Sequence, residues 1–165
     1  MSSKKVSRHV MICGLEASGK TTLFNLLVYG QPQELKNKPD IILDTHKEGA
    51  KEKETLGFNF EYAEPNQTAN CIGFWDLGGK DTIRAIWPSF YKNIQISGLI
   101  FVVNANDEDD RIIEARMELQ KLLNEEELRS SVLYVVFNDI ITKEDEEDKF
   151  NRVSDDPTIR QTVFF

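Results

Sequence analysis

The sequence has few cysteines, no long hydrophobic run and no excess of positive charge, and each shortage argues against a class of protein. Only two cysteines occur among 165 residues, each in a short apolar run, which favours a reducing compartment over a disulfide-stapled fold. Apolar runs such as Gly98 to Val103 are far too short to span a bilayer. The formal net charge is -8, which excludes a nucleic-acid partner held through a basic face. A small anion bound by backbone N–H groups and one lysine stays compatible with this charge.

The N-terminus lacks the features of targeting signals. Residues 1–8 form a polar tail without an apolar stretch, and Ser2 stands where N-myristoylation requires glycine. A hydrophobic content of 40% in a chain of this length indicates a single soluble domain over residues 1–165. We expect a monomer in the cytoplasm, with at most peripheral contact to an intracellular membrane.

Short apolar runs alternate with amphipathic segments along the chain. We expect helices at 21–29 and 111–128, and strands at 9–13, 58–62, 71–75, 99–103, 132–137 and 161–165. The runs at 99–103 and 132–137 are continuous and predict strands buried on both faces. The segments at 58–62 and 71–75 flank a turn cluster and predict an antiparallel hairpin at a sheet edge. This order predicts an α/β fold with a mostly parallel sheet.

Gly14 to Thr21 (GLEASGKT) fits the phosphate-loop pattern G-x-x-x-x-G-K-[ST] in full, between a predicted strand and a predicted helix. Backbone N–H groups of such a loop surround phosphates, and the positive end of the following helix adds to the attraction. We expect Lys20 to reach the β- and γ-phosphates and the Thr21 hydroxyl to bind Mg²⁺. The full set of expected phosphate-loop contacts is Gly14, Glu16, Ala17, Ser18, Gly19, Lys20, Thr21 and Thr22.

Three residues farther along the chain complete the expected site. Asp76 follows a predicted strand, where a carboxylate can bind Mg²⁺ through water, and Thr55 can supply a second hydroxyl to the metal. Gly79 can bring its N–H close to a γ-phosphate because it has no side chain. Taken singly, Asp76 and Thr55 would suit an ordinary turn and an ordinary strand start; with the phosphate loop, in this order, they favour a switch-type NTPase.

Several stretches together carry a resemblance to a known family: Gly14–Thr22 (GLEASGKTT), Thr55–Glu61 (TLGFNFE), Trp75–Gly79 (WDLGG), Asp81–Trp87 (DTIRAIW), Gly98–Val103 (GLIFVV) and Glu114–Leu128. They resemble the ADP-ribosylation-factor and Arf-like small GTPases. The resemblance implies a Ras-like P-loop fold with helices on both faces of the sheet, GDP and GTP as ligands, Mg²⁺, and two switch regions. It also implies effector, exchange and activating proteins as partners, and an effector surface built from Phe58, Trp75 and Phe90. From spacing alone, these aromatic residues could equally be hairpin core.

The sequence departs from this family at several places. Lys80 stands where the family has the glutamine that orients the attacking water, and an ammonium offers only donors, so we expect slow or absent intrinsic hydrolysis. The base-recognition pattern Asn-Lys-x-Asp falls on residues 138–141, with Asn138 kept and Ile141 in place of the aspartate; Thr142 to Asp145 offers a second register. We expect residues 31–54 to form a longer first switch region than is usual in the family, and we expect the given residues to lack the last helix that the resemblance implies.

Three functions follow from these observations. The first is a guanine-nucleotide switch that binds effectors and hydrolyses GTP poorly. The second is a competent GTPase completed by an activating protein, and the third is a scaffold that works without nucleotide. A small P-loop kinase would need clustered substrate-binding arginines, which the sequence does not offer.

Overall fold

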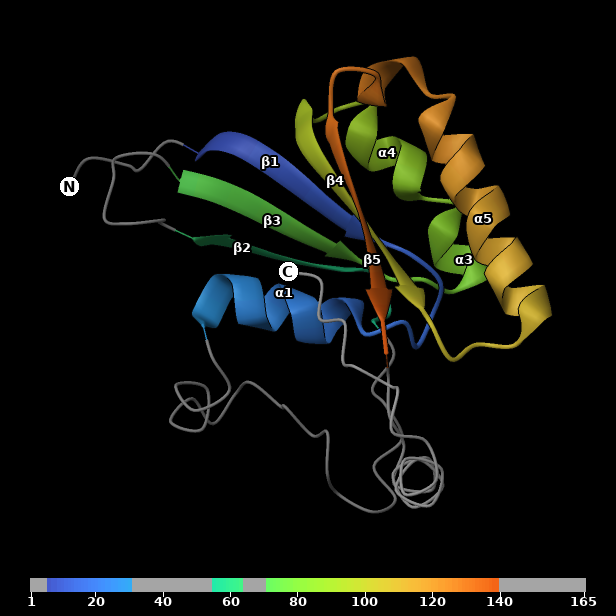
Figure 1. The fold of residues 1–165 in the computed structure, drawn as a ribbon. Coiled ribbons are helices and arrows are strands. Elements are labelled where there is room, and N and C mark those ends of the chain that lie inside the picture. Colours follow the sequence, from blue (N-terminus) through green and yellow to red (C-terminus); the bar gives the residue numbers. More distant parts are fainter. Residues whose placement is uncertain (1–5, 31–54, 64–70, 140–165) are drawn as a thin grey trace, which may run out of the picture.

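The computed structural model describes residues 6–30, 55–63 and 71–139 of the chain, and these form a five-stranded sheet with helices on both faces (Figure 1). The strands are β1 (Val6–Cys13), β2 (Phe58–Ala63), β3 (Cys71–Leu77), β4 (Ile96–Asn104) and β5 (Val132–Asn138). Their order in the sheet is β2-β3-β1-β4-β5. Only β2 runs antiparallel to its neighbour. The predicted α/β fold with one antiparallel edge hairpin is therefore confirmed.

Helices cover the two faces unequally. α1 (Lys20–Tyr29) lies on one face, and α3 (Asp81–Arg84), α4 (Trp87–Tyr91) and α5 (Asp109–Leu123) lie on the other (Figure 1). In the described ranges, no helix is long and apolar enough to cross a membrane. Side chains of β1 point alternately to the two faces of the sheet, so this strand packs against both helix layers. Met11 and Cys13 enter the core under α4 and α5, whereas Val10 and Ile12 pack in the cluster that contains Phe24 of α1.

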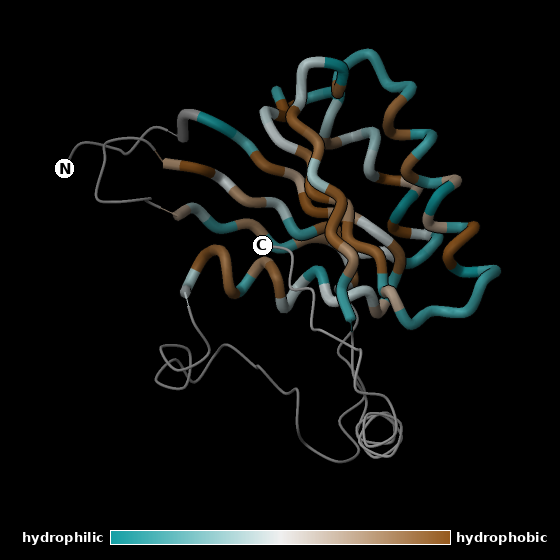
Figure 2. Tube along the Cα trace, in the orientation of Figure 1, coloured by the Kyte–Doolittle hydropathy of each residue, from teal (hydrophilic) through white to brown (hydrophobic). Residues whose placement is uncertain are grey.

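β4 and β5 are both apolar along their length (Figure 2), yet only one of them is buried. β4 is central and covered on both faces, as its continuous apolar run predicts. The same prediction for residues 132–137 is wrong, because Val132, Tyr134 and Phe137 are 57%, 63% and 69% exposed. β5 is the last strand of the described sheet, so a neighbour pairs with it along one edge only. The hydropathy of residues 132–137 correctly predicted a strand, but it could not predict where that strand lies in the sheet.

Two element boundaries also differ from the expectation. β1 begins at Val6, and Val6 and Arg8, expected in the polar tail, pair with β3 across a register shift. The helix expected over 111–128 ends at Leu123, and a separate 3-10 turn η2 (Glu126–Leu128) follows. The side-chain amide of Asn124 donates to the carbonyl oxygen of Gln120 at 2.8 Å, which satisfies one of the free carbonyls at the end of α5. Leu123, the last residue of α5, is exposed.

Several expectations fall outside the described residues. They concern the long first switch region at 31–54, the turn at 65–68, the alternative base motif at 142–145 and the strand at 161–165.

Candidate functional site

The loop between β1 and α1 has the backbone of an anion-binding turn. Gly14 has a φ of 144°, and a Cβ at this position would overlap the carbonyl oxygen of Val102 on β4. Ala17 and Gly19 also have positive φ values, 57° and 85°. A turn that departs from helix and strand geometry in this way leaves N–H groups available to an anion. α1 starts directly after it with no acidic residue in its first turn, so the positive end of the helix is not neutralised locally.

Lys20 lies inside this loop rather than in solvent. The side chain is buried, and its ammonium donates to the carbonyl oxygen of Leu15 and to Oγ of Ser18, the latter at 3.3 Å. A buried ammonium keeps its charge only where oxygen atoms or an anion compensate the loss of water. The loop therefore presents a fixed positive charge among backbone amides.

Three oxygen-bearing side chains from three separate segments meet beside the loop. Oγ1 of Thr21 donates to Oδ2 of Asp76 at 2.8 Å and lies 3.1 Å from Oγ1 of Thr55. Asn59 donates from Nδ2 to the same Asp76 oxygen at 2.9 Å, because Asn59 and Asp76 face each other in the β2–β3 register. The structure thus brings together all three residues that the sequence proposes as metal ligands.

Asp76 is the least satisfied polar group of this cluster. Its side chain is fully buried, and Oδ1 has no hydrogen-bond partner among the described residues. Burial raises the pKa of Asp76, while the hydrogen bonds from Asn59 and Thr21 and the charge of Lys20 act in the opposite direction. A buried carboxylate with a spare oxygen beside two hydroxyl groups is a donor set that fits a hard divalent cation such as Mg²⁺. The residues present are therefore compatible with the metal that the sequence analysis implies.

Asn138 joins the carboxyl end of β5 to the phosphate loop. Its side-chain amide donates to the carbonyl oxygen of Ser18 at 3.1 Å, across 120 residues of sequence. The backbone carbonyl oxygen of Asn138 accepts a hydrogen bond from the N–H of Ala105, which follows β4. Asn138 therefore contacts the phosphate loop, and the choice between the two base-motif registers stays a prediction; Ile141 and Asp145 are outside the described residues.

Residues 1–155 match the model of the ADP-ribosylation factor family. The chain belongs to this family. Its fold is also similar to the Arl6 (BBS3) small GTPase of Trypanosoma brucei, whose structure was solved with the bound nucleotide analogue GppNp. The two share 19% sequence identity with a TM-score of 0.56 over 89% of this chain and 95% of that one. The resemblance seen in the sequence and the Ras-like P-loop fold are confirmed.

In this Arf-family chain, the loop after β3 packs directly on the phosphate loop. A Cβ on Gly79 would overlap the backbone of Leu15 and Glu16, so no larger residue fits between the two segments. Lys80 comes next; it is exposed and precedes the first turn of α3. Gly79 is therefore close to the loop as expected, whereas the Lys80 side chain lies at the surface.

The expected effector aromatics form one cluster in the Arf-family fold. Ring centroids of Phe58 and Trp75 are 5.6 Å apart, and Phe90 lies 5.1 Å from Phe58 and 5.6 Å from Trp75. Phe60 and His9 pack against Trp75 as well. Phe58 is 50% exposed, Trp75 is half-buried and Phe90 is buried. The three therefore do not form an equally exposed patch: Phe90 is part of the core beneath the other two.

Sequence reasoning missed several residues that hold the site together. Asn59 binds Asp76, and Arg111 of α5 donates to the carbonyl oxygen of Glu16 in the phosphate loop at 2.8 Å. Arg84 and Trp87 hold the loop after β3 through its carbonyl oxygens. Asn59, Arg84 and Trp87 all lie within the stretches that carry the family resemblance, and that signal could have identified them. Thr22, expected to contact phosphate, is exposed on α1.

Proposed function

We propose that this Arf-family protein binds GDP and GTP with Mg²⁺ and acts as a molecular switch that hydrolyses GTP slowly. In the triphosphate state, the surface around Phe58 and Trp75 contacts effector proteins, and exchange and activating proteins regulate the cycle. A cytoplasmic location remains a prediction from the sequence.

One observation carries this proposal: Thr21, Thr55 and Asp76 converge beside the buried ammonium of Lys20. The hydroxyl groups of Thr21 and Thr55, together with the Asp76 carboxylate and its unbonded oxygen, suit a metal ion that also contacts phosphate. When bound, Mg²⁺ would offset the negative charge on the phosphate oxygens. Thr55 lies in a segment remote from the loop in sequence, so its presence in the cluster links the first switch region to the occupancy of this site.

The chain's own residues suggest how the two nucleotide states differ. Lys20 and the loop amides bind the phosphates that GDP and GTP share, and Gly79 offers a backbone N–H to the terminal phosphate of GTP. Lys80 follows Gly79 but cannot accept a proton from a water molecule or orient it through an acceptor atom. Loss of a group that positions water typically slows the reaction by about 10²- to 10⁴-fold. We therefore assign the protein a binding role with weak intrinsic hydrolysis.

The decisive experiment is to identify the nucleotide that co-purifies with the protein by mass spectrometry and to measure binding of GDP, GTP and ATP by calorimetry. We expect guanine nucleotides, with affinity reduced when EDTA removes the metal. Lys20→Ala should weaken binding at least about tenfold, since it removes charge-assisted hydrogen bonds to phosphate. Lys92→Ala, at an exposed lysine after α4, serves as the matched control and should bind normally. No uptake of any nucleotide with magnesium present would contradict the proposal and favour the scaffold alternative.

A further inference from the structure

The Gly78–Gly79 pair is enclosed between residues 55–57 and the phosphate loop. The N–H of Gly78 donates to the carbonyl oxygen of Gly57 at 2.8 Å, and a Cβ on Gly78 would overlap the carbonyl oxygen of Thr55. On the other side, Gly79 packs against the phosphate loop. The backbone orientation of Gly78 and Gly79 therefore decides whether their N–H or their C=O groups face the phosphate loop.

Two side chains from the following helices bind the carbonyl oxygens of this pair. Nε1 of Trp87 donates to the carbonyl oxygen of Gly78 at 3.0 Å, and a guanidinium nitrogen of Arg84 donates to that of Gly79 at 3.1 Å. Trp87 is only 2% exposed, so its indole has little freedom to move. Each carbonyl belongs to the peptide unit whose N–H comes from the next residue, and in a trans peptide the two groups point in opposite directions. Trp87 thus fixes the N–H of Gly79 pointing away from the indole, and Arg84 fixes that of Lys80 in the same manner.

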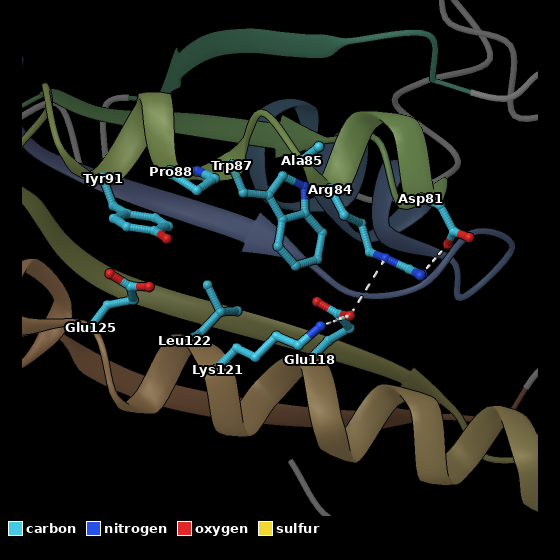
Figure 3. A pocket seen from close by; sticks show the side chains of 10 residues that line it. All are labelled: Asp81, Arg84, Ala85, Trp87, Pro88, Tyr91, Glu118, Lys121, Leu122 and Glu125. Atoms are coloured by element: carbon cyan, nitrogen blue, oxygen red, sulfur yellow. Dashed lines mark hydrogen bonds and ion pairs between the residues drawn. The ribbon is translucent and has the colours of Figure 1, made fainter.

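Helix α5 holds Arg84 in place. The guanidinium contacts the carboxylates of Asp81 and Glu114, and its Nε lies 4.0 Å from an oxygen of Glu118. Figure 3 shows Arg84 and Trp87 side by side along a cavity of about 390 Å³ that separates α3 and α4 from α5. Arg84 is mostly buried. A guanidinium with several donors can bind carboxylates and a carbonyl oxygen at the same time.

We propose that Trp87 and Arg84 are positioning residues that fix two successive peptide planes after β3, so that the Gly79 N–H is held ready for the terminal phosphate of a nucleoside triphosphate. Glu114 on α5 is the anchor that keeps Arg84 in this position. The inference rests on the proposed nucleotide switch and adds a specific regulation to it. Preference for triphosphate over diphosphate depends on side chains that do not touch the nucleotide.

The test compares the dissociation constants of GDP and the non-hydrolysable analogue GppNHp for Trp87→Phe, Arg84→Gln and Glu114→Gln. Trp87→Phe removes the N–H donor and keeps an aromatic ring, although the phenyl ring is smaller than the buried indole. We expect each variant to weaken GppNHp binding about tenfold and GDP binding by less than about threefold, since GDP has no terminal phosphate for Gly79 to bind. Tyr91→Phe removes the hydroxyl of another aromatic residue lining the same cavity, and Arg129→Ala removes an exposed arginine. Both controls should keep the wild-type ratio.

The outcomes separate the inference from the function on which it rests. Equal weakening of both nucleotides, or no change in their ratio, would overturn the positioning role while leaving the nucleotide switch intact. If Trp87→Phe does not fold, as judged by thermal unfolding, Glu114→Gln decides the matter, because it changes only the charge on an α5 side chain. If the wild-type protein binds neither nucleotide, the proposed function fails and the positioning role fails with it.

Discussion

The side-chain amide of Asn138 lies 3.1 Å from the carbonyl oxygen of Ser18, and this hydrogen bond joins the last described strand to the phosphate loop. β5 otherwise contacts the rest of the described sheet through β4 alone. The bond therefore ties the phosphate loop to the carboxyl end of β5.

Replacing Asn138 with alanine should release the loop. We expect Asn138→Ala to speed nucleotide dissociation by about threefold to tenfold, because a net hydrogen bond of about 1 kcal/mol is lost. Stopped-flow release of a fluorescent GDP analogue measures this rate. Asp145→Ala distinguishes the two base-motif registers. Faster release only in Asn138→Ala supports the Asn138 register, and an effect confined to Asp145→Ala supports the register at Thr142 to Asp145.

The two glycines at 14 and 98 allow a matched test of the phosphate-loop backbone. We expect Gly14→Ala to lower the free energy of unfolding by about 1–3 kcal/mol or more, because its Cβ would overlap the carbonyl oxygen of Val102 and its φ of 144° is unfavourable for alanine. Gly98→Ala should be tolerated, since the nearest atom to its Cβ would be a methyl group of Val10 at 3.4 Å. Urea denaturation measures both variants. A similar decrease in the free energy of unfolding for both variants would show that the close approach of Gly14 to Val102 does not cause the destabilisation.

Lys80→Gln tests whether the missing glutamine limits hydrolysis. We expect the single-turnover rate of GTP hydrolysis to rise by about 10²-fold or more, since an amide can both donate to and accept from the attacking water. Lys92→Gln makes the same exchange at an exposed lysine outside the site and should leave the rate unchanged. A wild-type rate as high as that of Lys80→Gln would assign water positioning to another group and favour the competent GTPase.

His9 gives the stability of the protein a predictable pH dependence. Nε1 of Trp75 donates to Nδ1 of His9 at 3.1 Å, which requires a neutral imidazole, and burial lowers the pKa of His9 below its ordinary value of 6.5. As the pH falls, the unfolded chain therefore binds this proton before the folded protein does, and the free energy of unfolding decreases below about pH 6.5. We expect His9→Gln, which keeps an acceptor for Trp75 but does not titrate, to show a smaller drop in Tm between about pH 7.5 and about pH 5.5. His46→Asn removes the other histidine and is the control; the same drop in wild type and His9→Gln would contradict the assignment.

Features encoded in contiguous residues could be predicted from the sequence. The phosphate loop, the position of α1 after it and the buried strand β4 follow from local patterns, because a glycine spacing or an apolar run needs no knowledge of distant residues. The three proposed metal ligands came from the same reasoning, and the structure brings them together. The prediction failed for the burial of β5. The apolar run of β5 reads like that of β4, but β5 lies at one end of the strand order and most of its side chains are exposed.

By itself, the sequence determined an alternating α/β chain with a phosphate loop, a family resemblance and an unusual lysine at position 80. Tertiary structure alone decided that Asn59 faces Asp76, that Asn138 reaches Ser18, and that Trp87 and Arg84 bind the carbonyl oxygens of two glycines. The physical reason is that each of these bonds depends on strand register or helix packing. Those are set by the burial of many side chains together, so the sequence around one of these residues does not show which residue it bonds.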